Sequence, residues 1–595
     1  MSPIPITYPT WKETFGVRPT EDQLLDQIRH LDRLHTFWLL ARINILLALD
    51  RLHRDPKETI SLQTHLVNTF IDEELFESLK KKFGPESLLD RQPFHSLQIL
   101  MLMKRVILEG AREGGIRPDV DREGAHRLGR CLLMASDFLF DEENSQAISV
   151  SRPSSKRRKI ALQLQVGSGI EVNNPPSIDK STVRSDIVFN EIAEKIGAKL
   201  DVRALFPVRT GLNLEAYVDL VFGVLTHYTI LDSAELIEKT GLACVNIKTY
   251  FAEADANSVE RFWQLELTTL DDLEEILRKP SLLKPQHDFI AFRQKPFVQV
   301  GEEDAVPIHV GFVQEKLESG LFWSIFHSLA SDEERASLFR DWGYLFEQYV
   351  SQTLRQALEN APETYFAFPK FTDNDEEAFD GIVVAGDYCV VMEYKGGFLK
   401  AEAKYAEDED EFIRDTDKKF GAGKKAGLEQ LCRKVGAVFA PKGRQKRLLH
   451  GVDLSSVKVV VPMLIVQEPF ISSEITATYL AEEFGTLKRK QEMDPSITCT
   501  FPLILDVSEV ENLKPYLSSA KISFIDCIME RIRIGSSGFL SFGDFLREYL
   551  NERKIVPMKD SETSERFRLI MNRVSKRFFN RPFPPNEEAV PPANG

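Results

Sequence analysis

The hydrophobic pattern divides the chain into regions of different secondary structure. Through residues 20–145, apolar side chains recur three and four positions apart, which predicts helices that each bury one stripe. Residues 185–300 mix helical and strand patterns, and a third region starts near Gly301. The most apolar run, Phe37–Leu49, contains the charged Arg42 and spans thirteen residues, which is too few to cross a bilayer.

Two short β-branched runs predict a hairpin in the second half of the chain. The runs are Ile382–Val384 and Val390–Val391, and the pair Gly386–Asp387 lies between them. Glycine adopts the positive φ that the first position of a type II′ turn requires. The pair therefore predicts a two-residue turn that joins two antiparallel strands.

This turn fixes which residues face each other across the two strands. If Ala385 pairs with Tyr388, then Asp380 falls directly opposite Glu393. Directly opposed residues of an antiparallel pair have Cβ atoms about 5 Å apart. Lys395 lies two positions beyond Glu393, so the period of a strand places it on the same face.

The arrangement of these charges predicts a metal site. Two opposed carboxylates destabilise a sheet unless a cation compensates them, and their hard oxygen ligands suit Mg²⁺ or Mn²⁺. The ammonium of Lys395 can then orient a water molecule or stabilise charge that develops on a phosphate. Two simpler interpretations stay open: an ordinary ion pair between Glu393 and Lys395 at a sheet edge, and a turn at Asp380–Gly381 itself.

The stretch of residues 379–397 resembles the PD-(D/E)XK, or restriction-endonuclease-like, nuclease superfamily. The resemblance implies that Asp380 is the aspartate of the family and that Glu393, Tyr394 and Lys395 are its (D/E)XK motif. It also implies that the metal ligands are the carboxylates of Asp380 and Glu393 and the backbone carbonyl of Tyr394. The expected core has the order αβββαβ and covers residues 330–470, roughly a quarter of the chain.

A helix is expected just before this core hairpin and its first strand. Ser331 and Glu334 form a capping box that predicts where the helix begins. The helix carries Glu347, which matches a glutamate that many family members place just upstream of the first strand. A solvated helix glutamate is the alternative interpretation of Glu347.

Two strands and a second helix complete the expected core. Strands are predicted at Thr364–Phe368 and at residues 457–466, and an amphipathic helix at Ala422–Val435. Gln430 lies on that helix, where some subfamilies keep a glutamine that contacts the site. Lys434 occupies the position of the tyrosine that accompanies this glutamine in those subfamilies.

The distribution of charge changes the interpretation of an acidic chain. A net charge of −16 argues against a nucleic-acid partner for the chain as a whole. Between Lys418 and Arg447, however, there are ten basic residues and one acidic residue, beside the predicted metal site, where a polyanion needs positive flanks. A second basic run is Arg566–Arg581, and either run could also be a solvated face. The residues assigned to phosphate contact are Lys424, Lys425, Arg433 and Lys434.

The length of the chain predicts several domains in an α/β multidomain protein. The expected fold combines a helical and mixed N-terminal region, a restriction-endonuclease-like core and a helical C-terminal region. The expected ranges are 1–150 for a helical domain, 151–300 for a mixed α/β region, 301–470 for the nuclease domain, 471–580 for an α/β to helical region and 581–595 for a disordered tail.

These features favour a metal-dependent nuclease that hydrolyses DNA. The six cysteines form no CxxC pair, which excludes a zinc ribbon, and no signal-peptide pattern is found, so a cytoplasmic protein without a membrane partner is expected. The N-terminal region would sense a signal or bind a protein partner or a second copy. Nucleases attached to long unfamiliar modules resemble prokaryotic defence effectors. The alternatives are a nuclease acting on RNA and a non-catalytic binding or scaffolding protein that retains the nuclease fold.

Overall fold

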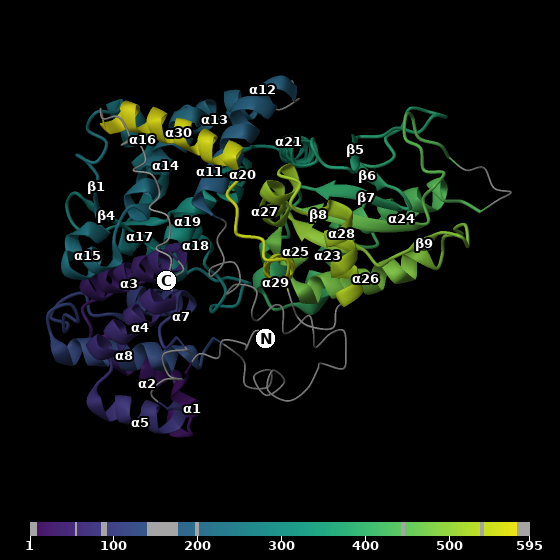
Figure 1. Cartoon of the computed structure of the whole chain (residues 1–595). Helices are drawn as coiled ribbons and strands as arrows, with labels where there is room; N and C mark the ends of the chain where they lie inside the picture. The colour runs from purple at the N-terminus through teal and green to yellow at the C-terminus, as the bar shows by residue number, and fades with distance from the viewer. Residues whose placement is uncertain are drawn as a thin grey trace.

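The protein is a mixed α/β protein in which two sheets lie in different regions (Figure 1). The computed structural model describes residues 9–53, 56–84, 92–139, 177–196, 201–441, 447–535 and 541–579. A four-stranded sheet lies among the helices of the first 330 residues, and a six-stranded sheet lies among the later helices. None of the described helices is both long and apolar enough to cross a membrane. The predicted tail at 581–595 lies outside the described residues.

The first part of the chain is helical, as the hydrophobic spacing predicts. Thr10 and Thr20 cap the first two helices with capping boxes, and the apolar α3 packs against α7 in the interior. The helices are α1 (Trp11–Phe15), α2 (Glu21–Arg29), α3 (Arg33–His53), α4 (Pro56–Phe70), α5 (Glu73–Phe83), α7 (Ser96–Glu109) and α8 (Arg122–Ser136).

The next region mixes helices with short strands in the sheet order β1-β4-β3-β2. Its strands are β1 (Val245–Asn246), β2 (Leu267–Thr268), β3 (Phe297–Gln299) and β4 (Asp304–Pro307). Its helices are α11 (Ile178–Asp186), η1 (Ile187–Ile192), α12 (Ala193–Ile196), α13 (Val202–Thr210), α14 (Leu214–Thr229), α15 (Ser233–Glu238), η2 (Thr240–Ala243), α16 (Ala256–Glu266), α17 (Leu270–Leu277), α18 (Ile290–Gln294), α19 (Val310–Glu315) and α20 (Ser319–Ser328).

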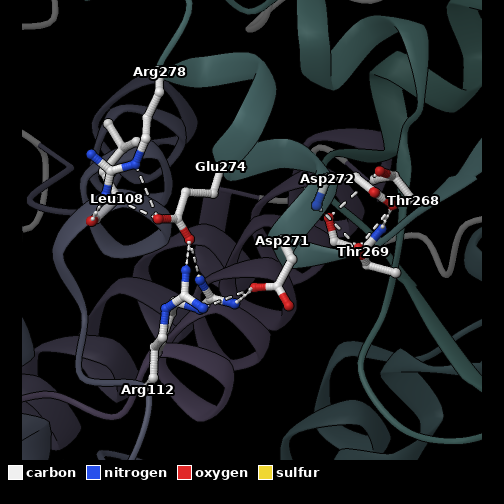
Figure 2. Close-up of polar contacts among 9 residues, drawn as sticks. Leu108, Arg112, Thr268, Thr269, Asp271, Asp272, Glu274 and Arg278 are labelled. Atoms are coloured by element: carbon white, nitrogen blue, oxygen red, sulfur yellow. Dashed lines mark hydrogen bonds and ion pairs between the residues drawn. The ribbon is translucent and has the colours of Figure 1, made fainter.

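Hydrogen-bonded ion pairs with arginines connect α17 to the N-terminal helices. Glu274 of α17 accepts hydrogen bonds from Arg33 (2.6 Å), Arg112 (2.6 Å) and Arg278 (2.9 Å). Figure 2 shows Glu274 between Arg112 and Arg278, and Arg278 also donates to the carbonyl of Leu108 at the end of α7 (3.1 Å). Because these groups come from both regions, the helical and mixed regions are held as one body.

A single hydrophobic core runs through both of these regions. It includes residues from Leu24 to Trp342, together with Phe398 and the buried side chains of the last helix, and the boundary expected at residue 150 falls outside the described residues. β4 pairs with β3 and β1, and α19 and α20 belong to the same core. β4 thus pairs with strands that precede it in the chain, although it lies inside the range 301–470 expected for the nuclease domain.

The later sheet has the order β10-β8-β7-β6-β5, with β9 also on β8. β5, β6 and β7 are antiparallel neighbours, whereas β8 runs parallel to β7 and β10 parallel to β8. The strands are β5 (Thr364–Ala367), β6 (Gly381–Ala385), β7 (Tyr388–Lys395), β8 (Val459–Val466), β9 (Thr498–Cys499) and β10 (Leu503–Asp506). Since β10 lies beside β8, the segment after residue 470 is part of the same sheet and does not start a separate fold.

Helices cover both faces of this sheet. One core packs α21, α27, α28 and α29 on the face of Tyr394, and another packs α23, α24 and α26 on the face of Leu464. The helices are α21 (Asp332–Ala357), α22 (Ala401–Tyr405), α23 (Glu409–Lys419), α24 (Gly427–Val438), α25 (Pro469–Ser472), α26 (Glu474–Lys488), α27 (Val507–Ser518), α28 (Phe524–Ile534), α29 (Phe542–Glu552) and α30 (Ser561–Phe579).

One of the two predicted core helices begins at the expected residue, and the other begins later. α21 begins after the N-cap Ser331 with the predicted capping box to Glu334. The helix predicted from Ala422 begins only at Gly427, because the preceding residues fold into turns: the N–H of Gly423 donates to the carbonyl of Asp417. Lys424 and Lys425 therefore lie in a loop and not on a helix.

The last helix, α30, returns to the N-terminal body (Figure 1, yellow) and packs against α11 and α14. Asp219 of α14 is fully buried and accepts hydrogen bonds from Arg573 (2.7 Å) and Arg577 (2.9 Å). Arg566 binds Asp186 (2.6 Å). Three arginines of the second basic run thus bind carboxylates of the N-terminal body, whereas Arg568 pairs with the exposed Glu565, and the available surface for a polyanion is smaller than the sequence suggests.

We expect Asp219→Asn to destabilise the N-terminal body by about 2 kcal/mol, because two arginines lose their shared carboxylate but stay partly hydrated. Urea denaturation measures the change, and limited proteolysis should show earlier cleavage next to α30. Glu215→Gln is the matched control, since its carboxylate lies 3.9 Å from Arg577 at the surface. It should cost less than about 1 kcal/mol. Equal effects of both variants would contradict this account of α30.

Candidate functional site

The β6–β7 hairpin brings two carboxylates to the same level of the sheet. Gly386 has a φ of 55° in the turn, a left-handed value that glycine adopts without strain. The register pairs Gly381 with Met392, as the turn predicts. Asp380 lies one position beyond that pair and so is level with Glu393.

Asp380 lies where β6 stops pairing with β7. Its backbone N–H donates to the carbonyl of Met392 (3.1 Å), and its Oδ2 accepts a hydrogen bond from the N–H of Tyr394 (2.5 Å). The residue is 4% exposed. Burial raises the pKa of Asp380 well above its ordinary value, and the carboxylates of Glu393 and Glu347 raise it further. The site therefore favours a proton or a cation on this carboxyl group over a bare charge.

Glu393 is buried and forms ion pairs with two lysines. Its Oε1 lies 2.7 Å from Nζ of Lys395, and its Oε2 lies 3.1 Å from Nζ of Lys434. Burial lowers the pKa of Lys395, but the carboxylates of Glu393 and Asp380 more than offset this and hold it above its ordinary value. Lys395 is therefore a protonated hydrogen-bond donor at the site.

Glu347 of α21 faces the same group of charges. Burial raises its pKa to about 7, the ammonium of Lys395 acts in the opposite direction, and the carboxylates of Glu377 and Glu393 raise it. Glu347 is thus one of the residues that the structure brings to the site. Its carboxyl group is more buried than that of a freely solvated helix glutamate.

Glu377 is a site residue that the sequence reasoning missed. Its exposed side chain hydrogen-bonds to Asp380, and its charge acts on Glu347. It lies in an acidic loop between β5 and β6, where no periodicity marks one carboxylate as different from its neighbours.

Close packing of α24 on the sheet brings Lys434 to Glu393. A Cβ atom on Gly427 would come within 2.6 Å of Leu464 and 3.3 Å of Lys395, so a glycine is needed for this approach. Lys434 lies on the buried stripe of the helix, three residues after Leu431. The structure thus places Lys434 inside the site and not among the surface residues expected to contact phosphate. The helical spacing could have revealed this.

The other predicted residues of this segment lie outside the carboxylate cluster. The side chain of Gln430 donates to the carbonyl of Lys425 (2.8 Å), so it braces the turn before α24. Lys424, Lys425 and Arg433 are exposed. Among the described residues of the basic stretch, these three and the exposed Lys418 can meet a polyanion at the surface.

Several other basic residues between Lys418 and Arg447 are engaged within the protein. Lys419 pairs with Asp415 (2.9 Å), and Arg447 pairs with Asp373 (2.7 Å). Lys442, Arg444 and Lys446 lie outside the described residues. The local excess of positive charge at the surface is therefore smaller than the count of ten basic residues.

No protein-family model, curated protein or solved structure matches this chain. Its function must be inferred from the geometry of the site. In the described part of the chain, no group of three or more His, Cys, Asp or Glu side chains is placed to hold a metal ion as it stands. Both carboxylate oxygens of Glu393 are instead paired with lysines. The donors are nonetheless of the type that fits Mg²⁺ or Mn²⁺.

The raised pKa of Glu347 predicts a pH dependence of stability. Between the ordinary pKa of 4.5 and the folded value of about 7, the folded protein keeps a proton that the unfolded chain has lost. Stability should therefore fall as pH rises from about 4.5 to 7 and level off above it. We expect Glu347→Gln to remove up to about 3 kcal/mol of this dependence, at about 1.4 kcal/mol for each pKa unit.

Urea denaturation in EDTA at pH 5, 6, 7 and 8 measures this effect. Glu333→Gln, at an exposed glutamate of the same helix, is the control and should keep the wild-type dependence. Parallel pH profiles for wild type and Glu347→Gln would show that Glu347 is not buried among these charges.

Proposed function

We propose that the protein is a metal-dependent nuclease that hydrolyses phosphodiester bonds of DNA at a PD-(D/E)XK-type site. The observation that carries the proposal is the pair of buried carboxylates, Asp380 and Glu393, level with each other where β6 leaves β7. Lys395 lies on the same face and pairs with Glu393. Neither the ion pair alone nor a turn at Asp380 explains why a second carboxylate is buried here.

The order of the elements supports this proposal. α21 precedes the antiparallel strands β5, β6 and β7, then α22, α23 and α24 follow, and β8 lies parallel to β7. With α24 taken as the second core helix and α22 and α23 as an insertion, this order is compatible with the αβββαβ core that the resemblance implies. The added β10 extends the sheet on the far side of β8, away from the hairpin.

Asp380, Glu393 and the backbone carbonyl of Tyr394 are the groups that would hold Mg²⁺ or Mn²⁺. The N–H of Tyr394 is directed toward Asp380, and the carbonyl of a strand residue points to the same side as its N–H. When bound, the cation supplies Lewis-acid polarisation of the phosphate and activation of a water molecule. The repulsion that raises the pKa of Asp380 is the force that such a cation would relieve.

The protein's own residues then have separable tasks. Lys395 keeps its proton at Nζ, so it can donate a hydrogen bond to the attacking water or to a phosphate oxygen. Glu347, with a pKa of about 7, can exchange a proton near neutral pH, which suits a general acid or base. Lys424, Lys425 and Arg433 would neutralise backbone phosphates beside the site.

The N-terminal body is proposed as a sensing or assembly module, as in a prokaryotic defence effector. It contacts the segment that follows Lys395: Glu407, between α22 and α23, lies 2.8 Å from Nε2 of His287 and accepts from Gln286 (2.9 Å). The ring of Phe398 also lies 5.1 Å from that of Phe322 in α20. A conformational change in the N-terminal body can therefore be transmitted through these contacts to the segment that follows Lys395.

We expect Asp380→Asn and Glu393→Gln each to lower the rate of cleavage by at least about two orders of magnitude, because each removes a charged ligand from the site. The assay uses linear, circular and single-stranded DNA and RNA with Mg²⁺, Mn²⁺ or EDTA, which also separates DNA from RNA. Asp387→Asn is the matched control at the other end of the hairpin and should cut normally. Cleavage by the two site variants at the wild-type rate would contradict the assignment. A wild type that binds nucleic acid but cuts none would favour a scaffold.

A second test concerns the exposed lysines. Replacing Lys424 and Lys425 with Ala should weaken DNA binding, and the slope of log Kobs against log salt should fall by about 0.9 for each lost phosphate contact. The rate at saturating DNA should change much less than the affinity, because these groups position the backbone. The control removes another exposed pair, Lys81 and Lys82 of α5. An unchanged affinity and salt slope would identify the pair at 424–425 as an ordinary solvated face.

A further inference from the structure

Lys434 is a buried lysine that pairs with a carboxylate the proposed cation needs. It is 8% exposed, and its Nζ lies 3.1 Å from Oε2 of Glu393. Lys395 already pairs with Oε1 of the same carboxylate at 2.7 Å. Each carboxylate oxygen of Glu393 is thus paired with the ammonium group of a lysine. Both oxygens are occupied on the side where a cation would bind.

This pairing explains how the acidic site is stable without a cation. A buried carboxylate is costly unless it is paired, and Glu393 has Asp380 and Glu347 as acidic neighbours. Lys434 contributes one positive charge to this group. A divalent cation brought to Glu393 would compete with that ammonium for the carboxylate and would be repelled by it.

The position of Lys434 allows it to leave without a movement of the helix. α24 is fixed at its start by the close contact of Gly427 with Leu464 and Lys395. The ammonium of a lysine, in contrast, is carried on a flexible four-carbon stem. Rotation about the bonds of this stem would free one oxygen of Glu393 while the backbone of α24 stays in place.

We propose that Lys434 is a built-in counter-ion that holds the place of the divalent cation at Glu393, and that cation binding displaces it. The inference rests on the proposed metal site. It makes Lys434 a positioning residue whose removal has two opposite effects. The metal-free protein loses stability, while the affinity for the cation rises. A purely structural role for Lys434 would lower stability without strengthening cation binding.

Titration calorimetry of the full chain with Mn²⁺ alone, without nucleic acid, tests the inference. We expect Lys434→Met to bind Mn²⁺ about tenfold more tightly or better, since it removes the competing charge and keeps an apolar stem of similar length. Lys434→Arg keeps the charge and should stay close to wild type. Lys458→Met is the matched control, because Lys458 pairs with Asp387 at the other end of β7, and its affinity should not change. In thermal unfolding, Lys434→Met should have a lower midpoint in EDTA and recover toward wild type with Mn²⁺.

The outcomes separate this inference from the proposed function. If wild type binds Mn²⁺ and Lys434→Met binds it equally or more weakly, the displacement is wrong and the metal site stands. If neither protein binds Mn²⁺, the metal site itself fails. Binding by Lys434→Met alone would support displacement in its strongest form. If the methionine variant does not fold, Lys434→Gln carries the same expectation, because it also removes the charge.

Discussion

The burial of Glu393 opposite Asp380 is the constraint on which the later half of the structure depends. Two carboxylates at one level of a sheet repel each other, and removal of water increases that repulsion. Positive charge must therefore be supplied from the surrounding elements. The hairpin supplies Lys395 from the same strand, and α24 supplies Lys434 from a layer above it. The packing of the apolar face of α24 on the sheet, close at Gly427, is what brings Lys434 to this carboxylate.

The charged residues of this site come from elements that are far apart in the sequence. Glu347 comes from α21, the acid of Glu377 from the loop before β6, and Lys434 from α24. The pKa values of Asp380, Glu347 and Lys395 are all moved by this one group of charges. The site is thus a coupled set in which a proton, an ammonium or a cation at one position alters the others.

The parts of the site that depend on local sequence could be predicted. The turn at Gly386–Asp387 and the twofold period of a strand define the register, and these suffice to place Asp380, Glu393 and Lys395. Lys434 was interpreted by its charge, although its spacing from Leu431 marked it as buried. Glu377 had no local signal, because its role depends on how a loop folds back on a strand.

The arrangement of the larger regions could not be predicted from local pattern. β4 lies within the range 301–470 expected for the nuclease domain, but its pairing partners β1 and β3 come earlier in the chain. β10 pairs with β8 across an intervening helical segment, and α30 contacts α14 over 354 residues of sequence. Such contacts depend on which apolar faces pack against each other in the folded chain. A single sequence does not show which faces these are.

The return of α30 to the N-terminal body has a consequence for synthesis on the ribosome. Asp219 leaves the ribosome 354 residues before Arg573, which at about 5–20 residues per second amounts to tens of seconds. During this interval the face of α14 that α30 covers has no cover from the chain. The core shared by Phe222, Met571 and Phe578 closes only after the six-stranded sheet has been made. Completion of the first region therefore waits until α30 has been synthesised, after every strand of the six-stranded sheet.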